Sequence, residues 1–222
     1  MKREKKTYKE FVIEEINKAP IGEPIYISGI ADAMSDYYSI EPNQATAATS
    51  VAIKRIIDRN EVEGLRAFKK GVYYIAKETP FGETGINLEK LIFDKYLQDG
   101  KGYIGGLMGL YQMGLTTQIP KTKELVTNAA KDCLRKDKDL GVSIRPPKTI
   151  ITDENIEYLK ALDAMELMDK APIDAKEPYR ILANYINDKG LNYRTMLALA
   201  DKYYPKNTII RLAHVAGVGG AM

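Results

Sequence analysis

The stretch EPNQATAATSVAIKRIIDRNEVEGLRAFKKGVYYI, residues 41–75, decides the fold of the N-terminal part because its periodicity changes half-way. In the first half, apolar residues recur every three to four positions, which is the spacing of an amphipathic helix. Pro42 suits the first turn of such a helix, and Gly64 follows its end. This half therefore predicts a helix whose apolar face contains Ala45, Ala48, Ala52, Ile53, Ile56 and Ile57.

The second half has the pattern of a β-hairpin. Residues 65–68 and 72–75 are largely apolar or aromatic, and the turn residues Lys69-Lys70-Gly71 separate them. Upstream, residues 8–18 have helical spacing, 25–27 are short and extended, and Ser28 is placed to cap a second helix. Three helices followed by a hairpin is the order of a winged helix-turn-helix.

Beyond this region, Thr79-Pro80-Phe81-Gly82 has the composition of a linker. We therefore expect a winged helix-turn-helix domain at 1–78 and a C-terminal α+β domain with a small sheet and several helices at 79–222. The fold class is α+β and mostly helical. The elements expected in the second domain are helices at 88–97, 105–113, 155–168, 177–188, 193–203 and 207–215, short strands at 115–120 and 124–128, and an extended segment at 141–151.

Composition excludes several classes of site. Of 222 residues, 45% are hydrophobic and 28% charged, as in ordinary globular proteins. Cys133 and His214 are the single cysteine and histidine, which excludes an intramolecular disulfide and Cys- or His-rich metal sites, and argues against a nucleophile with a histidine base. No stretch of 18 apolar residues and no N-terminal apolar run occurs, so we expect neither a membrane span nor a signal peptide, and a cytoplasmic protein.

The net charge is only +3, but its position is informative. Residues 54–77 carry seven Lys or Arg and three Asp or Glu, so the excess lies at the end of the third helix and in the hairpin. In winged helices these parts meet the phosphates of DNA. Arg66, Lys69 and Lys70 are the candidate wing contacts, with a solvated surface hairpin as the alternative.

The third helix also presents a polar face. Short side chains on the side opposite the apolar face would let the helix sit deep in the major groove and bond base edges. The alternative is plain exposed helix surface. Since no Arg lies in the first half of the helix, strong bidentate recognition of guanine is not predicted there. The candidate DNA-binding residues of this helix are Asn43, Thr46, Ala47, Ser50 and Lys54, with Gln44 beside them.

Two features that suggest enzymes are interpreted otherwise. Residues 100–105 fit G-x-G-x-x-G, but the preceding residues are typical of a helix, whereas a dinucleotide site needs a strand there. A helix end with a tight turn is the interpretation. Acidic residues on the C-terminal helices, Asp163 among them, have lysines nearby and are interpreted as solvated helix faces. We expect no enzyme, no cofactor and no metal.

Several segments in order resemble one family. Residues 51–75 resemble the helix and wing of AbiEi-type antitoxins, the antitoxin-regulators of type IV toxin–antitoxin systems. Residues 103–128 (YIGGLMGLYQMGLTTQIPKTKELVTN) resemble the start of that family's second domain. The motifs NIEYLKALD at 155–163 and LADKYY at 199–204 are similar to its helical end. Order and spacing are more specific here than any single motif.

The resemblance implies a winged helix that binds its own promoter on double-stranded DNA and represses its operon. Paired copies on an inverted repeat are one arrangement compatible with this. It also implies a C-terminal domain that counteracts a nucleotidyltransferase-type toxin, generally without a stable complex. Residues 129–141 depart from the family, because acidic residues interrupt the basic ones there. The alternatives are a protein-interaction module that binds the toxin directly and, less favoured, an enzyme.

Overall fold

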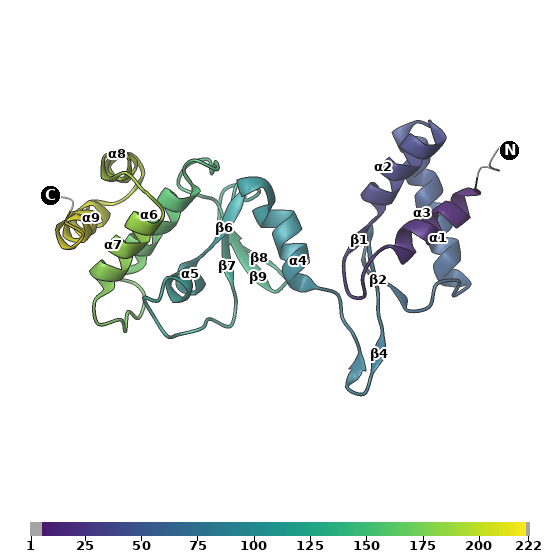
Figure 1. Ribbon diagram of the computed structural model, residues 1–222, viewed down its shortest axis with the longest axis horizontal. Coiled ribbons are helices and arrows are strands. Elements are labelled where there is room, and N and C mark those ends of the chain that lie inside the picture. The colour runs from purple at the N-terminus through teal and green to yellow at the C-terminus, as the bar shows by residue number, and fades with distance from the viewer. Residues whose placement is uncertain (1–5, 221–222) are drawn as a thin grey trace. The chain divides into compact units, whose positions relative to one another are not determined.

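The computed structural model describes residues 6–220 (Figure 1). They form a mixed α+β fold, as expected, which divides into two compact units, Met1–Leu91 and Ile92–Met222. Each unit has its own hydrophobic core. Among the described residues, no helix combines the length and the apolar character that crossing a membrane requires.

Three helices dominate the first unit, as predicted. They are α1 (Tyr8–Asn17), α2 (Ile27–Tyr38) and α3 (Pro42–Asp58). A capping box between Thr7 and Glu10 starts α1, and a proline in the first turn starts α3. The cap expected at Ser28 is wrong, because α2 already begins at Ile27, and the side chain of its N-cap residue, Tyr26, makes no capping hydrogen bond to the helix.

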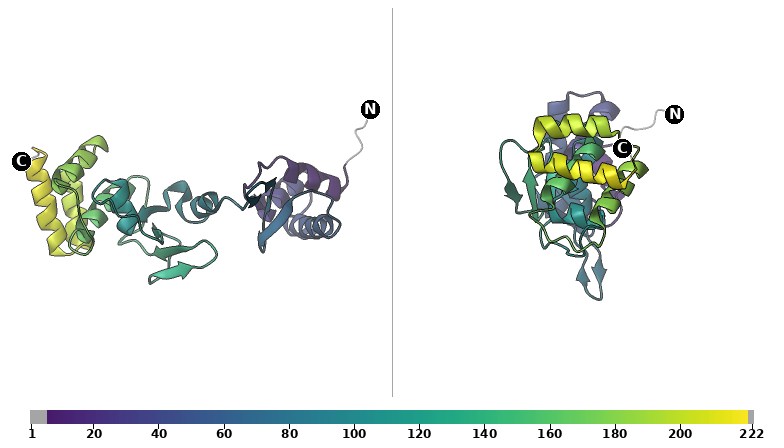
Figure 2. Two further views of the ribbon diagram at one scale, coloured as in Figure 1. Left: turned by 90° about the horizontal axis from the view of Figure 1, so that it is seen from below. Right: turned by 90° about the vertical axis from the view of Figure 1, so that its left-hand side faces the viewer.

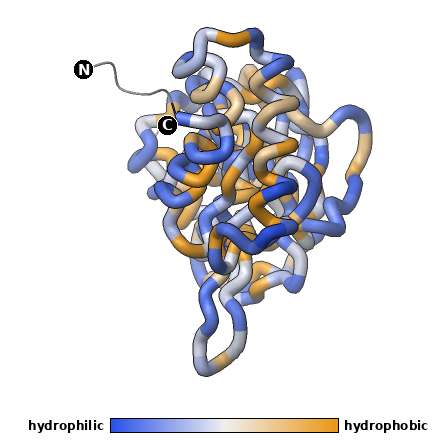
Figure 3. The backbone as a smooth tube through the Cα atoms, turned by 90° about the vertical axis from the view of Figure 1, so that its right-hand side faces the viewer, coloured by the Kyte–Doolittle hydropathy of each residue, from blue (hydrophilic) through white to orange (hydrophobic). Residues whose placement is uncertain are grey.

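The predicted hairpin is confirmed as β2 (Leu65–Lys69) and β3 (Val72–Ile75). With β1 (Ile25–Tyr26) they make an antiparallel sheet of order β1-β3-β2, with a bulge between Ala67 and Lys69. Hydrophobic and hydrophilic segments alternate along the helices (Figure 3). The apolar ones meet in one core, which includes Phe11, Val12, Ile16, Ile30, Met34, Ala45, Ile53, Ile56 and Leu65.

The segment expected to be a linker is instead a second hairpin, so that expectation is wrong. Strands β4 (Glu78–Thr79) and β5 (Gly82–Glu83) pair, and the Thr79 hydroxyl donates to the Gly82 carbonyl at 2.6 Å. The chain then returns to the first unit, because the Asn87 amide donates to the Gly22 carbonyl at 2.7 Å. The division between units therefore falls after Leu91, beyond the expected boundary at residue 78.

The second unit contains a four-stranded sheet of order β6-β7-β9-β8. Strands β7 and β9 are parallel and the other neighbours antiparallel. The strand expected at 124–128 is confirmed, whereas 115–120 is not a strand, and neither β6 nor β8 was expected. The strands are β6 (Gly102–Gly105), β7 (Glu124–Thr127), β8 (Arg135–Asp137) and β9 (Val142–Arg145).

The helices of the chain after residue 87 follow the predicted order. The helix expected at 88–97 is a short α-helix that continues as a π-helical turn, Phe93–Leu97. In the second unit α6, α7 and α9 lie side by side (Figures 1 and 2), and α6 also packs against β6. The α-helices are α4 (Leu88–Ile92), α5 (Gly106–Gln112), α6 (Ile156–Leu167), α7 (Pro178–Asp188), α8 (Tyr193–Tyr203) and α9 (Lys206–Val218).

Candidate nucleic-acid interface

Helix α3 exposes the face that its sequence predicts. The residues facing the core recur at helical spacing and are buried, among them Ala45, Thr49 and Ile53. The residues between them point to solvent. The exposed positions include all six candidates, Asn43, Gln44, Thr46, Ala47, Ser50 and Lys54.

Two hydroxyls on this face bond back to their own helix. Thr46 Oγ1 donates to the Pro42 carbonyl at 2.9 Å, and Ser50 Oγ donates to the Thr46 carbonyl at 2.8 Å. Each hydroxyl thereby uses its proton and keeps lone pairs toward solvent. In this state the face offers acceptors, which suit the amino groups of adenine and cytosine in the major groove.

The turn before α3 holds this face in place. Only residues 39–41 separate α2 from α3, and Ser39 adopts a left-handed conformation (φ 55°). Ser35 Oγ donates to the Ile40 carbonyl at 2.7 Å, which ties the turn to the end of α2. Buried Thr49 contacts Met34 Sδ across the two helices. A helix pair joined by a turn of three to four residues is the arrangement found in helix-turn-helix proteins.

The turn of the β2–β3 hairpin presents two of the candidate cations. Lys70 is exposed, whereas Lys69 is half-buried, with its ammonium 5.9 Å from the centre of the Phe68 ring. Gly71 takes a positive φ of 82°, which glycine adopts without strain. Its carbonyl accepts a 3.0 Å bond from the Ile27 amide, so the turn is anchored at the start of α2.

The third candidate, Arg66, is engaged within the protein. Its guanidinium lies 2.6 Å from the Glu83 carboxylate and also donates to the Leu65 carbonyl at 3.2 Å. Sequence reasoning missed this partner because it placed a linker where β5 lies. A phosphate contact by Arg66 would therefore require its guanidinium to leave Glu83, whereas Lys54 and Lys70 make no ion pair within residues 6–220.

The second unit contains a buried ionic cluster at a position that was expected to be solvated. Asp163 on α6 is only 4% exposed, so the expectation of a solvated face is wrong for this residue. Its carboxylate accepts bonds from Tyr103 (2.7 Å), Tyr204 (2.8 Å) and Arg145 (2.5 Å). Arg145 also bonds Glu124 at 2.9 Å.

The protonation of this cluster follows from its burial. Burial and the neighbouring Asp163 carboxylate raise the pKa of Tyr103, so its hydroxyl stays protonated. Burial alone would lower the pKa of Arg145, but Asp163 and Glu124 outweigh it and raise that pKa above its ordinary value. With both oxygens of Asp163 bonded, the cluster joins β6, β9, α6 and the end of α8 as a structural element.

The features that suggested enzymes are explained by local structure. Gly100 ends the helical turn Gln98–Gly100, as interpreted, whereas Gly102–Gly105 is strand β6, and a Cβ on Gly106 would lie 3.4 Å from Glu124 Oε1. A carboxylate thus occupies the start of α5, where a dinucleotide site would place its phosphates. Within residues 6–220, no group of three or more His, Cys, Asp or Glu side chains could hold a metal ion.

Comparisons with known proteins add little. No family model and no curated protein matches the chain. A similar solved structure is the crystal structure of the RV2827C protein from Mycobacterium tuberculosis, with a TM-score of 0.46 and 12% identity. The match covers 98% of this chain and 79% of that one. What the protein does must therefore be inferred from its own residues.

Proposed function

We propose that the first unit is a winged helix-turn-helix that binds double-stranded DNA, with α3 in the major groove and the β2–β3 turn on the flanking phosphates. One observation carries the proposal: the exposed positions in the first half of α3 are small or polar residues and carry no carboxylate. No Asp or Glu occurs from Pro42 to Ile57, although Glu41 directly precedes the helix and Asp58 is its last residue. Such a face suits close contact with an anionic partner, because it has small side chains and no negative charge to repel the partner.

The dimensions agree with this use. A helix with its side chains is roughly 10–12 Å across and the major groove is about 12 Å wide, so bulky side chains would hold the helix away. Ala47 and Ser50 at the centre of the face permit close approach, and Asn43 near its start is a residue that pairs with adenine. Lys54, Lys69 and Lys70 supply cations for phosphates.

We infer from the resemblance to AbiEi-type antitoxins that the DNA is the protein's own promoter. The protein then acts as a repressor and antitoxin, and its second unit counteracts a nucleotidyltransferase-type toxin. Two copies on an inverted repeat would satisfy the symmetry of such an operator. On this proposal the protein acts in the cytoplasm, where its promoter lies.

Fluorescence anisotropy with a labelled promoter duplex and a scrambled duplex of equal length tests DNA binding. We expect tighter binding to the promoter and a steep loss of affinity with salt, because lysine contacts release counterions. Replacing Lys69 and Lys70 together by alanine should weaken both complexes and reduce the salt slope by about one per lysine. The matched control is Lys176→Ala with Lys206→Ala, which removes the same charge from exposed positions of the second unit.

Absence of binding to either duplex at low salt would overturn the DNA-binding proposal. The antitoxin role is tested separately by coexpression with the nucleotidyltransferase-type toxin that the proposal expects to be encoded beside it. We expect growth to be restored and the two proteins to elute independently in gel filtration. Coelution would favour the protein-interaction module instead, and failure to restore growth would contradict the antitoxin role.

A further inference from the structure

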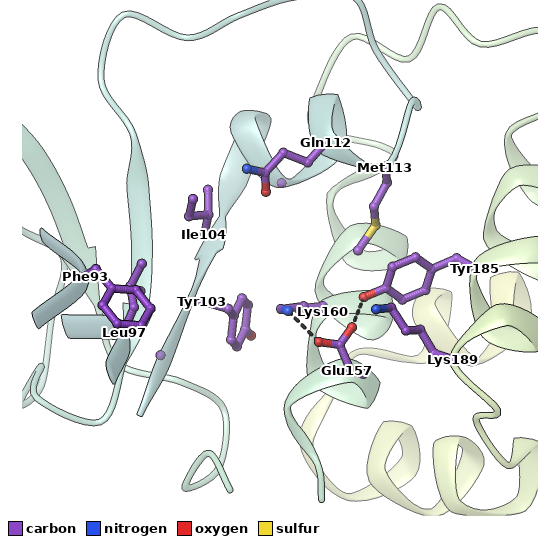
Figure 4. A pocket seen from close by; sticks show the side chains of 12 residues that line it. Phe93, Leu97, Tyr103, Ile104, Gln112, Met113, Glu157, Lys160, Tyr185 and Lys189 are labelled. Atoms are coloured by element: carbon purple, nitrogen blue, oxygen red, sulfur yellow. Dashed lines mark hydrogen bonds and ion pairs between the residues drawn. The ribbon is translucent and has the colours of Figure 1, made fainter. Parts of the chain in front are cut away.

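A pocket of about 370 Å³ opens within the second unit and plays no part in the proposed contact with DNA. Strand β6 and helix α5 supply one side, α6 and α7 the other, and the π-helical turn Phe93–Leu97 a third (Figure 4). Pockets for small molecules generally measure roughly 300–1,000 Å³. This one lies at the lower end of that range, so it suits a ligand of one or two rings.

One part of the lining is apolar. Phe93 and Leu97 come from the π-helical turn, Ile104 from β6, and Met113 from the end of α5 (Figure 4). π-Helical turns are rare and frequently occur at functional sites. Gly102 and Gly109 also line the pocket and add no side chain to it. Both positions require glycine, because a Cβ at either would lie within 3 Å of backbone atoms.

The opposite part is polar and already internally bonded. Lys160 Nζ donates to Glu157 Oε1 at 2.6 Å, and the Tyr185 hydroxyl donates to the other carboxylate oxygen (Figure 4). Burial raises the pKa of Glu157, but the bonds from Lys160 and Tyr185 outweigh it and leave that pKa below its usual value. Glu157 is therefore ionised at neutral pH, and both of its oxygens have donors.

Lys189 adds a second cation at the same place. It follows the last turn of α7 and lines the pocket beside Tyr185 and Glu157 (Figure 4). Its ammonium makes no hydrogen bond or ion pair with any residue from 6 to 220. Because the charge of Lys160 is balanced by Glu157, Lys189 leaves the lining with a net charge of one positive unit. This charge lies in the same pocket as the apolar residues.

We propose that this pocket binds a small organic monoanion with a flat apolar body, such as an aromatic carboxylic or sulfonic acid. The anionic group contacts the Lys189 ammonium, and the ring rests against Phe93 and Met113. A cationic ligand is disfavoured, because Glu157 has no oxygen left without a donor. The proposal does not depend on DNA binding, since every residue it uses lies in the second unit.

Isothermal titration calorimetry on the full chain tests the proposal, with naphthalene-2-sulfonate and 2-naphthylmethylammonium as probes. They carry the same ring with opposite charge. We expect saturable binding of the sulfonate at one site, and binding of the ammonium at least about tenfold weaker, the effect of exchanging an attractive charge contact for a repulsive one. Lack of saturable sulfonate binding, or equal affinities for the two probes, would overturn the proposal.

Variants locate the site. Lys189→Gln removes an exposed cation and should weaken sulfonate binding by about fivefold, the scale of one partly exposed charge contact. Met113→Trp should fill the pocket and abolish binding, with circular dichroism verifying the fold. Lys176→Gln is the control, because it makes the same change at an exposed position outside the pocket. Unchanged affinity in Lys189→Gln would contradict the assignment even if Met113→Trp failed to fold.

Discussion

Arg66 on β2 and Glu83 on β5 form an ion pair with 2.6 Å between guanidinium nitrogen and carboxylate oxygen, which links the two hairpins of the first unit. Both side chains are partly exposed, at 45% and 35%. The pair therefore contributes little to the free energy of unfolding. Its chief effect is to keep the Arg66 guanidinium, which borders the proposed DNA contact, paired with Glu83.

Releasing Arg66 should strengthen DNA binding. In Glu83→Gln the guanidinium loses its internal partner and a negative charge disappears, so we expect affinity for promoter and scrambled duplexes to rise by roughly two- to tenfold at low salt. The salt slope should steepen by about one. Anisotropy titrations over a salt series measure both. Glu78→Gln, the same change on β4, is the control, and an equal gain there would show a general charge effect rather than release of Arg66.

Recognition of sequence should depend on Asn43. It is exposed at the start of α3, and an asparagine that bonds an adenine edge contributes about 1–3 kcal/mol of discrimination. Asn43→Ala should lower affinity for the promoter by about five- to a hundredfold and leave scrambled DNA nearly unaffected. Competition titrations with the two duplexes measure this ratio. Asn184→Ala, at an exposed position of α7, is the control, and equal losses on both duplexes in Asn43→Ala would contradict base recognition.

Local signals in the sequence predict much of the first unit. Pro42 marks the start of α3, and the change of period at Leu65 and the turn at Gly71 mark the hairpin. These signals can be recognised in the sequence because each structural feature is determined by residues that are neighbours along the chain. The same periodicity places the candidate residues of α3 on the exposed face. Thr79-Pro80-Phe81-Gly82 is misleading, since the same turn residues suit a linker and a tight hairpin equally.

Long-range partners explain what the sequence does not predict. Asp163 has the pattern of a solvated helix residue, yet its partners Tyr103, Arg145 and Tyr204 lie 60, 18 and 41 positions away. Glu83 likewise follows Arg66 only after two intervening strands, β3 and β4, and the turn of the second hairpin. Helical or strand periodicity contains no information about such pairs, because they form only when separate elements pack.

Asp163 should be essential for the stability of the second unit. In Asp163→Asn the volume is kept, but Arg145 loses its buried counter-charge and the hydroxyls of Tyr103 and Tyr204 lose their charged acceptor. Breaking a buried pair in this way costs about 3–5 kcal/mol in the free energy of unfolding. Urea denaturation followed by circular dichroism measures the loss. Asp188→Asn, at an exposed position at the end of α7, should change the midpoint little, and an equally small change in Asp163→Asn would refute a structural role for the cluster.

Asp137 should make stability depend on pH in the acid range. Burial tends to raise its pKa, but bonds from Lys95 and Tyr96, both 2.7 Å long, outweigh this and lower the pKa to about 2. A carboxylate with a lowered pKa in the folded state stabilises that state fully above its unfolded pKa of about 4, and loses the contribution as the pH falls toward 2. The difference in unfolding free energy between the wild type and Asp137→Asn should therefore be constant above about pH 5 and shrink between about pH 4 and 2. Denaturation series at several pH values measure this difference, with Asp139→Asn as the neighbouring control; a difference that does not change across this range would mean that Asp137 titrates alike in the folded and unfolded states.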